Sequence, residues 1–209
     1  MYFLNLLKIA LEFATFNNAY EDIASNFFEH FLYIANAVNY NRGTGLWDEQ
    51  DGFYYDRLRL PNGEDRRIQI RSLVGLVPIF ATATIEQELI DRLPGFRQRM
   101  RWFIDHRPHL TDHVASMTLQ GVEQRRILSV VKPDQLKIIL MRVFDELEFV
   151  SPYGIRSLSR YHKEHPYTLP VDGTVYQVQY DPGESTTGIF GGNSNWRGPI
   201  WFPMNFLII

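Results

Sequence analysis

The sequence feature that most constrains the fold is a segment of nearly fifty residues, from Ser151 to Pro199, with little helical pattern and many Gly, Pro, Ser, Tyr and Asn residues. A compact domain rarely contains a loop of this length unless the loop is functional. The core must therefore come mainly from the rest of the chain. The polar and aromatic residues concentrated in the loops become the candidates for a functional site.

Apolar residues recur at helical spacing over much of the remaining chain. The first forty residues contain two such segments, separated near an Asn-Asn pair. The most strongly periodic helix is expected to begin at Pro133 and to extend through Glu148. Shorter helices are expected over residues 72–80, 85–93 and 95–105. The turn signal Pro61-Asn62-Gly63 predicts a β-hairpin between residues 53–60 and 64–70.

Composition indicates one globular domain, or part of one. The chain has 209 residues, of which 45% are hydrophobic and 22% are charged, enough for one sizeable core. The net charge is −3 and the basic residues are dispersed among acidic ones, so the chain has no field that would attract nucleic acid. No segment reaches the ~18 uninterrupted apolar residues of a membrane span. We therefore expect neither a nucleic acid nor a membrane as partner.

The N-terminal segment lacks a basic leader, and polar residues interrupt its apolar stretch, so it does not resemble a signal peptide. We expect a cytoplasmic protein. The chain has no cysteine, which excludes disulfides and thiolate metal sites but does not prove a reducing compartment. Phosphate-binding, dinucleotide-binding and nucleophile-elbow motifs are missing from the sequence, so nucleotide and acyl-transfer chemistry have no support.

Three histidines, His106, His109 and His113, have spacings that resemble part of a zinc site. Pro108 prevents a regular helix through them, and no other cluster of ligands lies near in sequence. We therefore expect no metal and no cofactor.

The first candidate site is an acidic and aromatic segment from Trp47 to Asp56, with four carboxylates among four aromatic side chains. Glycosidases need paired carboxylates because one donates a proton to the leaving oxygen while the other activates water or attacks. The alternative is an acidic turn and a strand end whose aromatic residues pack inward. The residue types are compatible with both.

Two parts of the long loop add further candidates. The stretch Ser151–Ser159 follows the long predicted helix directly, so Arg156 would lie at a helix C-terminus that can meet ligand hydroxyls. An ordinary surface connection is the alternative. Glu184, in the turn-like stretch Tyr180–Ser185, is a second candidate for sugar binding.

The segment from residue 192 to residue 209 combines aromatic and polar side chains in a way typical of sugar-binding surfaces. Trp196 and Trp201 lie five residues apart, with Arg197 between them and with Asn195 and Asn205 nearby. Indole rings stack on the C–H faces of sugars, while amide and guanidinium groups bond the hydroxyls. We therefore predict that this segment contacts a carbohydrate.

The block Trp196-Arg197-Gly198-Pro199-Ile200-Trp201, with Asn205 following, resembles the Trp-x-Gly-Pro-x-Trp-x-x-x-Asn signature of family sixty-three of the glycoside hydrolases. Blocks at residues 47–56, 71–76 and 153–159 are similar to its bacterial members, which include mannosylglycerate hydrolase-like and glucosidase-like proteins. The resemblance extends over the whole chain. It implies a place in the sugar pocket for the residues that match the motifs: Trp47, Asp48, Asp56, Arg156, Trp196, Arg197, Trp201 and Asn205.

The resemblance implies an all-α fold, a partial (α/α)6 barrel or toroid, whose long loops form the sugar pocket at one end. It also implies hydrolysis of α-glucosidic or α-mannosidic bonds with inversion, by an aspartic general acid and a glutamic general base and without a metal.

The chain departs from the family pattern in two ways. It contains neither the Gly-Trp-Asp motif of the general acid nor the motif of the base, and about seven helical segments fall short of the twelve in a closed ring. We therefore expect residues 1–209 to be part of a catalytic domain, truncated at both ends and inactive alone, that supplies walls of the sugar pocket. The rival interpretation is a non-catalytic carbohydrate-binding or interaction module. A toroid of unrelated chemistry, such as a terpene cyclase, would need Asp-rich metal-binding helices that the sequence lacks.

Overall fold

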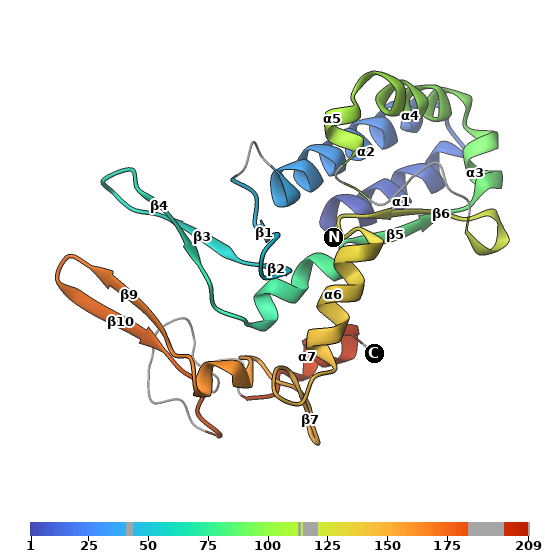
Figure 1. Cartoon of the computed structure of the whole chain (residues 1–209). Coiled ribbons are helices and arrows are strands. Elements are labelled where there is room, and N and C mark those ends of the chain that lie inside the picture. Colours follow the sequence, from blue (N-terminus) through green and yellow to red (C-terminus); the bar gives the residue numbers. More distant parts are fainter. Residues whose placement is uncertain (41–43, 113, 115–120, 184–198, 209) are drawn as a thin grey trace. The chain divides into compact units, whose positions relative to one another are not determined.

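The computed structural model describes residues 1–40, 44–112, 114, 121–183 and 199–208, which fall into two compact units (Figure 1). Unit 1 comprises Met1–Trp47 and Pro78–Asp134, and unit 2 comprises Asp48–Val77 and Gln135–Ile209. Each unit is therefore built from two stretches of chain that are separated in sequence.

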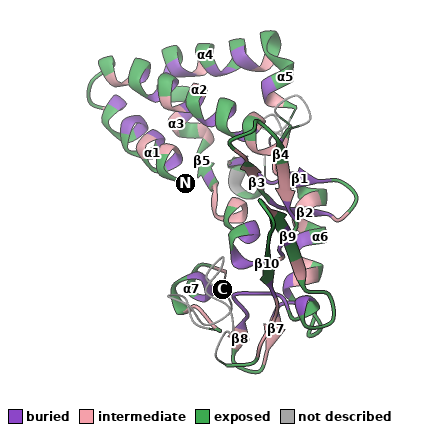
Figure 2. Cartoon of the chain, turned by 90° about the vertical axis from the view of Figure 1, so that its left-hand side faces the viewer, coloured by how far each residue is buried: buried purple, intermediate pink, exposed green. Residues whose placement is uncertain are grey.

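Unit 1 is mainly helical. Its first two helices, α1 (Tyr2–Ala14) and α2 (Ala19–Asn39), pack against each other and confirm the two helical segments predicted for the first forty residues. Buried and exposed residues form stripes along these helices (Figure 2), as expected for amphipathic helices. Three further helices follow: α3 (Gln87–Arg92), α4 (Pro94–His106) and α5 (Pro108–Thr111). Pro94 and Pro108 occupy first turns, where a missing N–H costs no intrahelical bond.

Unit 1 also contains a two-stranded antiparallel sheet that we did not predict. It is formed by β5 (Thr82–Ile85) and β6 (Arg126–Ser129). The predicted helix over residues 85–93 is wrong at its start, because Ala83 and Ile85 are buried and alternate with exposed threonines, which is the period of a half-buried strand. The short 3-10 helix η3 (Val122–Gln124) precedes β6.

One apolar core joins both stretches of unit 1, with buried residues from α1, α2, α4 and the strand pair. Phe28 of α2 is completely buried, and its ring meets Phe96 and Phe103 of α4 edge-on at 5.9 and 6.2 Å between centroids. Among the described residues, every helix is too short or too polar to span a bilayer.

Unit 2 consists of short strands and short helices. Its helical elements are the 3-10 helices η2 (Leu73–Phe80) and η4 (Arg160–Lys163) and the α-helices α6 (Pro133–Val143) and α7 (Phe202–Ile208). η2 and α6 run across the sequence boundaries between the units. The strand pairs are β1 (Trp47–Asp48) with β2 (Phe53–Tyr54), β3 (Asp56–Arg59) with β4 (Asp65–Ile68), β7 (Val150–Ser151) with β8 (Gly154–Ile155), and β9 (Tyr167–Val171) with β10 (Thr174–Val178).

Two hairpins extend from unit 2 (Figure 1). The β3–β4 hairpin confirms the hairpin predicted around Pro61-Asn62-Gly63. In the β9–β10 hairpin, Val171 pairs with Thr174, and the two residues between them, Asp172 and Gly173, both have positive φ (48° and 80°). This Asp-Gly pair is the sequence signature of a type I′ turn. A small apolar cluster joins the two hairpins: Ile68, Ile70, Leu158, Leu169 and Val178.

The predicted all-α fold is wrong. Of the described residues, 49% are helical and 21% are in strands, which form five small two-stranded antiparallel sheets. The error lies mainly between residues 151 and 183, which were predicted as loop but contain β7 to β10. Short extended segments satisfy their backbone groups by pairing with a neighbour, so a Gly-rich and Pro-rich stretch still builds hairpins.

The longest predicted helix also ends early. α6 stops at Val143 instead of Glu148. The Leu147 N–H bonds Asp145 Oδ1 at 2.8 Å, and the Glu148 N–H bonds the Asp145 carbonyl at 3.0 Å, so a turn replaces the last helical turn. Glu148 is thereby buried, within hydrogen-bond distance of Arg71 and Arg142.

Candidate functional site

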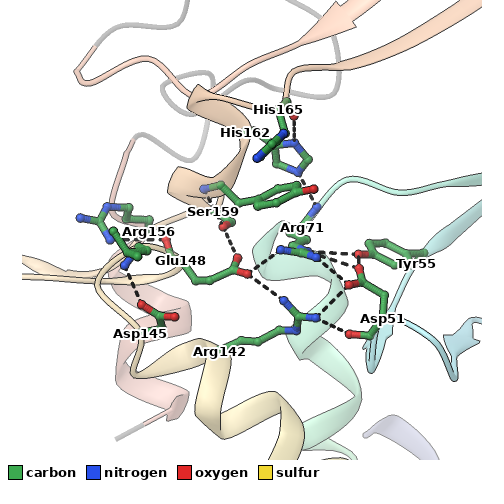
Figure 3. A network of polar contacts seen from close by, with 12 residues as sticks. Asp51, Tyr55, Arg71, Arg142, Asp145, Glu148, Arg156, Ser159, His162 and His165 are labelled. Carbon is green, nitrogen blue, oxygen red and sulfur yellow. Dashed lines mark hydrogen bonds and ion pairs between the residues drawn. The ribbon is translucent and has the colours of Figure 1, made fainter.

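A cluster of charged side chains in unit 2 is centred on Arg71, which lies between β4 and η2 (Figure 3). Its Nη2 donates to Asp51 Oδ1 at 2.6 Å and its Nη1 donates to Glu148 Oε1 at 2.5 Å. The Tyr161 ring covers the guanidinium, whose Cζ lies 3.9 Å from the ring centroid. Only 11% of the Arg71 side chain is exposed, so these contacts largely replace water around its charge.

Arg142 of α6 is the second cation of the cluster. Its Nη2 donates to Asp51 Oδ1 at 2.8 Å and its Nη1 donates to Glu148 Oε1 at 2.7 Å. Each guanidinium therefore bonds both carboxylates, and each carboxylate bonds both guanidiniums. We call Asp51, Arg71, Arg142 and Glu148 the charge ring. Its formal charges cancel, which is the condition under which ionised groups tolerate burial.

Two hydroxyl groups complete the bonding of the charge ring. The Tyr55 hydroxyl donates to Asp51 Oδ2, and the Ser159 hydroxyl donates to Glu148 Oε2. Burial raises the pKa of Tyr55, and its hydrogen bond to Asp51 adds to the rise, so the hydroxyl keeps its proton at neutral pH. Both carboxylates thus have donors on each oxygen.

His162 is buried and bonds the backbone of Arg71, a member of the charge ring. Its Nε2 accepts a hydrogen bond from the Arg71 N–H at 2.9 Å, and its Nδ1 lies 2.9 Å from the His165 carbonyl oxygen. A nitrogen that accepts from an N–H carries no proton, so Nδ1 holds the proton and the imidazole is neutral. Burial lowers the pKa of His162, and the charge of Arg71 acts in the same direction.

Asp51 of the charge ring and the nearby Asp48 are held in the ionised state. Burial alone would raise the pKa of Asp51, but hydrogen bonds from Arg71 and Tyr55 and the charges of Arg71 and Arg142 outweigh it, so the pKa is lowered. Asp48 has a lowered pKa for similar reasons: burial opposes ionisation, but backbone N–H groups and Arg67 outweigh it. A general acid needs a raised pKa, so neither group is suited to donate a proton near neutral pH.

A surface pocket of about 330 Å³ opens beside the charge ring. Three aromatic rings contribute to its lining, from Tyr55, Tyr161 and Tyr167. Asp51 and Arg71 of the charge ring also line it, and the remaining lining residues are Gln69, His162, His165 and Pro166. Pockets for small molecules are commonly about 300–1,000 Å³ and combine aromatic walls with a few polar groups. The arrangement suits a small polar ligand with an apolar face.

The candidates predicted from the sequence have other contacts. Asp48 Oδ1 accepts from the Gln50 and Asp51 N–H groups, and Asp48 Oδ2 accepts from Arg67 at 2.5 Å. Trp47 is buried in β1, whereas Asp56 is exposed at the start of β3.

Two further candidates hold the loop between α6 and η4. Arg156 Nη1 donates to the carbonyls of Glu146 at 3.1 Å and Val150. Asn205 of α7 accepts from the Ile155 N–H at 2.6 Å and donates to the Ile155 carbonyl at 3.1 Å. Trp201 is half-buried, directly before α7. None of the predicted candidates among the described residues lines the pocket.

Four candidates, Glu184, Asn195, Trp196 and Arg197, lie outside the described residues. His113 of the histidine cluster lies outside them as well. Within the described part of the chain, no three His, Asp or Glu side chains are grouped as metal ligands would be.

Several pocket residues were not singled out from the sequence, although some lie in segments that were. Asp51 and Tyr55 belong to the acidic and aromatic segment, and Arg71 opens the block at residues 71–76. Tyr161, His165 and Tyr167 were missed. The available signal was their spacing, since three rings within seven residues of a loop resemble a binding surface more than a core.

Comparison with known proteins adds one relative. The chain is 49% identical over 222 aligned residues to an uncharacterized protein of Saccharomyces cerevisiae. The alignment covers 99% of this chain and 20% of the yeast protein, so the chain spans about a fifth of the length of that relative. No family model matches the chain, and no solved structure matches it.

Proposed function

We propose that this chain supplies a saccharide-binding pocket to a longer α-glycoside hydrolase that acts on α-glucosidic or α-mannosidic bonds. The observation that carries the proposal is the pocket beside the charge ring, with its three tyrosine rings and adjacent polar side chains. The Tyr167 ring can stack on the C–H face of a pyranose, while Gln69 and His165 can bond its hydroxyls.

The charge ring favours a neutral ligand. Arg71 and Arg142 each bond Asp51 and Glu148, so their charges are compensated within the protein. An anionic ligand would have to compete with two carboxylates already in place, which costs free energy. A neutral sugar needs hydrogen-bond partners and a stacking surface, and the pocket offers both.

The blocks that resemble the glycoside hydrolase family support the same site. Three of them, at residues 47–56, 71–76 and 153–159, are distant in sequence, yet each supplies a part of the charge ring or of its bonding partners: Asp51 and Tyr55, then Arg71, then Ser159. Sequence motifs that meet around one pocket are expected where the pocket has a function.

The described residues favour binding over bond cleavage. Asp51 and Glu148 are bonded to arginines and hydroxyls, and the lowered pKa of Asp51 is opposite to what a proton donor requires. We therefore assign this chain the pocket wall and expect the general acid and base of the proposed enzyme from other parts of a longer protein.

The test uses the 209-residue chain and titration calorimetry with maltotriose and α-1,2-mannobiose. We expect binding of at least one sugar and no release of sugar from nitrophenyl α-glucoside or α-mannoside. Gln69→Ala should weaken binding about fivefold, the value of one hydrogen bond of ~1 kcal/mol. Gln177→Ala, which changes the same residue type on exposed β10, is the matched control and should bind as the unaltered chain does.

Failure of both sugars to bind would contradict the pocket assignment, and so would equal affinity of the Gln69→Ala and unaltered chains. The rival, a non-catalytic binding module, is separated by assaying the full-length yeast relative on the same substrates. Turnover supports the hydrolase, whereas binding without turnover supports the module.

A further inference from the structure

Unit 1 contains a second pocket of about 560 Å³, in the groove between α2 and α4. One face of α2 lines it with residues at positions i, i+3 and i+4, and one face of α4 lines it with the same periodicity. These residues are Asp22, Ser25, Asn26, Gln98, Arg99 and Trp102.

Gly95 lines the groove at the N-terminus of α4. A Cβ atom at this position would lie 2.9 Å from Glu21 Oε2, which is closer than real Cβ contacts allow. That same oxygen accepts a hydrogen bond from the Phe96 N–H at 2.7 Å, so Glu21 caps α4 from the neighbouring helix. The groove therefore has a hydrogen-bonded end without a side chain at residue 95.

The polar side chains along the groove are not engaged with each other. Within the described residues, the side chains of Asp22, Asn26 and Gln98 make no hydrogen bond or ion pair, and Arg99 contacts only the rings of Trp102 and Phe103. Their donors and acceptors are thus available to a ligand. One carboxylate and one guanidinium balance each other, so the groove carries no net formal charge from these residues.

Trp102 presents an aromatic surface in the groove and is held in position. Its ring stands edge-on to Phe103 at 5.1 Å between centroids and is stacked with His106 at 5.3 Å. It remains 39% exposed. A fixed, partly exposed indole loses little freedom when a ligand stacks on it, which improves affinity.

We propose that this groove is a second saccharide-binding site, for a neutral hexose unit of an oligosaccharide. The indole of Trp102 takes the C–H face of the sugar, while Asn26, Gln98 and the two charged side chains bond its hydroxyls. The proposal depends on residues of unit 1 alone and stands whether or not the pocket in unit 2 binds sugar.

Nuclear magnetic resonance of the 15N-labelled chain can test this, because the chain has four tryptophans and each indole N–H gives its own signal. Trp102→Phe assigns the Trp102 signal. We expect maltotriose or α-1,2-mannobiose to shift this signal with millimolar saturation. Arg99→Ala should weaken the response roughly tenfold, because a charge-assisted bond is lost, and Asn26→Ala about fivefold, because a neutral bond is lost. Arg101→Ala, on the same helix but lining a different pocket, should leave it unchanged.

Other outcomes overturn the proposal. A Trp102 signal that neither sugar shifts contradicts it. A signal that sodium sulfate shifts but sugar does not shows an anion site instead. If Gln69→Ala, in the pocket of unit 2, abolishes the Trp102 response, the sugar acts through that pocket and the groove is not a site. Circular dichroism and melting temperature show whether each variant is folded, and Asn26→Ser replaces Asn26→Ala if the latter is not.

Discussion

Glu148 accepts hydrogen bonds from three side chains: Arg71 and Arg142 share Oε1, and Ser159 donates to Oε2. Glu148→Gln keeps the shape of the side chain but removes its charge, which leaves two arginines with Asp51 as their remaining carboxylate. Loss of one partner from a buried ion pair costs about 3–5 kcal/mol. We expect the free energy of unfolding, measured with urea, to fall by roughly 3 kcal/mol.

The matched control is Glu64→Gln, since Glu64 pairs with Arg66 on the exposed side of the β3–β4 hairpin. Exposed pairs contribute little, so this change should leave the urea midpoint nearly where it was. Equal effects of the two substitutions would show that the charge ring does not stabilise unit 2.

The charge ring itself could not be predicted from the sequence. Asp51 lies 20 residues from Arg71 and 91 residues from Arg142, so no local pattern signals the contacts. Both interpretations of the acidic and aromatic segment from Trp47 to Asp56, a binding site and a turn with inward-packing aromatic residues, each agree with part of the structure. Phe53 is completely buried, as an inward-packing turn predicts, whereas Tyr55 contributes to the pocket, as a site predicts.

At the scale of elements, regular periodicity was a good guide and composition a poor one. α1, α2 and α4 follow their apolar spacing, and a Pro-Asn-Gly turn identifies the β3–β4 hairpin. The β9–β10 hairpin carries an equally clear Asp172-Gly173 signal. It was missed because it lies in a long segment whose Gly and Pro content suggested a single loop.

Gly173→Ala tests the turn of the β9–β10 hairpin. The residue has a φ of +80°, and a Cβ atom there would meet nothing within 4 Å, so the cost is one of backbone conformation alone. A left-handed conformation costs a residue with a Cβ atom about 1–2 kcal/mol. We expect the hairpin amides to lose protection from hydrogen exchange by a corresponding factor of roughly ten.

Gly121→Ala serves as the comparison, because Gly121 has a φ of −89° and its added Cβ would make ordinary contact at 3.5 Å. Gly121→Ala should change the hydrogen exchange of the β9–β10 amides little. An unchanged protection of the β9–β10 amides in Gly173→Ala would contradict the type I′ turn.

For the whole molecule, stability should depend on pH through groups in unit 2. The folded protein holds His162 neutral below the pH of about 6.5 at which an ordinary histidine takes up a proton. The unfolded chain then binds more protons, so the free energy of unfolding falls as the pH falls, by up to roughly 1.4 kcal/mol per pH unit. Asp48 and Asp51, whose pKa values are lowered, contribute stability that is lost only below about pH 4.

Urea unfolding at pH 7.5, 6.5 and 5.5 measures the first of these effects. His162→Gln keeps an acceptor for the Arg71 N–H but cannot titrate, so its stability should change less between pH 6.5 and 5.5. His165→Gln, at an exposed neighbouring position, should keep the slope of the unaltered chain. A slope that survives in His162→Gln would assign the pH dependence to another group.

The division of unit 2 into two stretches of sequence determines when it can fold during synthesis. Asp51 and Arg71 emerge from the ribosome before the second stretch of unit 1, and Glu148 follows Arg71 by 77 residues. At ~5–20 residues per second, this is a delay of roughly 4–15 seconds. All residues of unit 1 are synthesised before Glu148, so the charge ring can form only after the helical core is able to fold. For several seconds the first stretch of unit 2 therefore exists without Arg142 and Glu148. During this time water solvates the charges of Asp51 and Arg71 that these partners later contact.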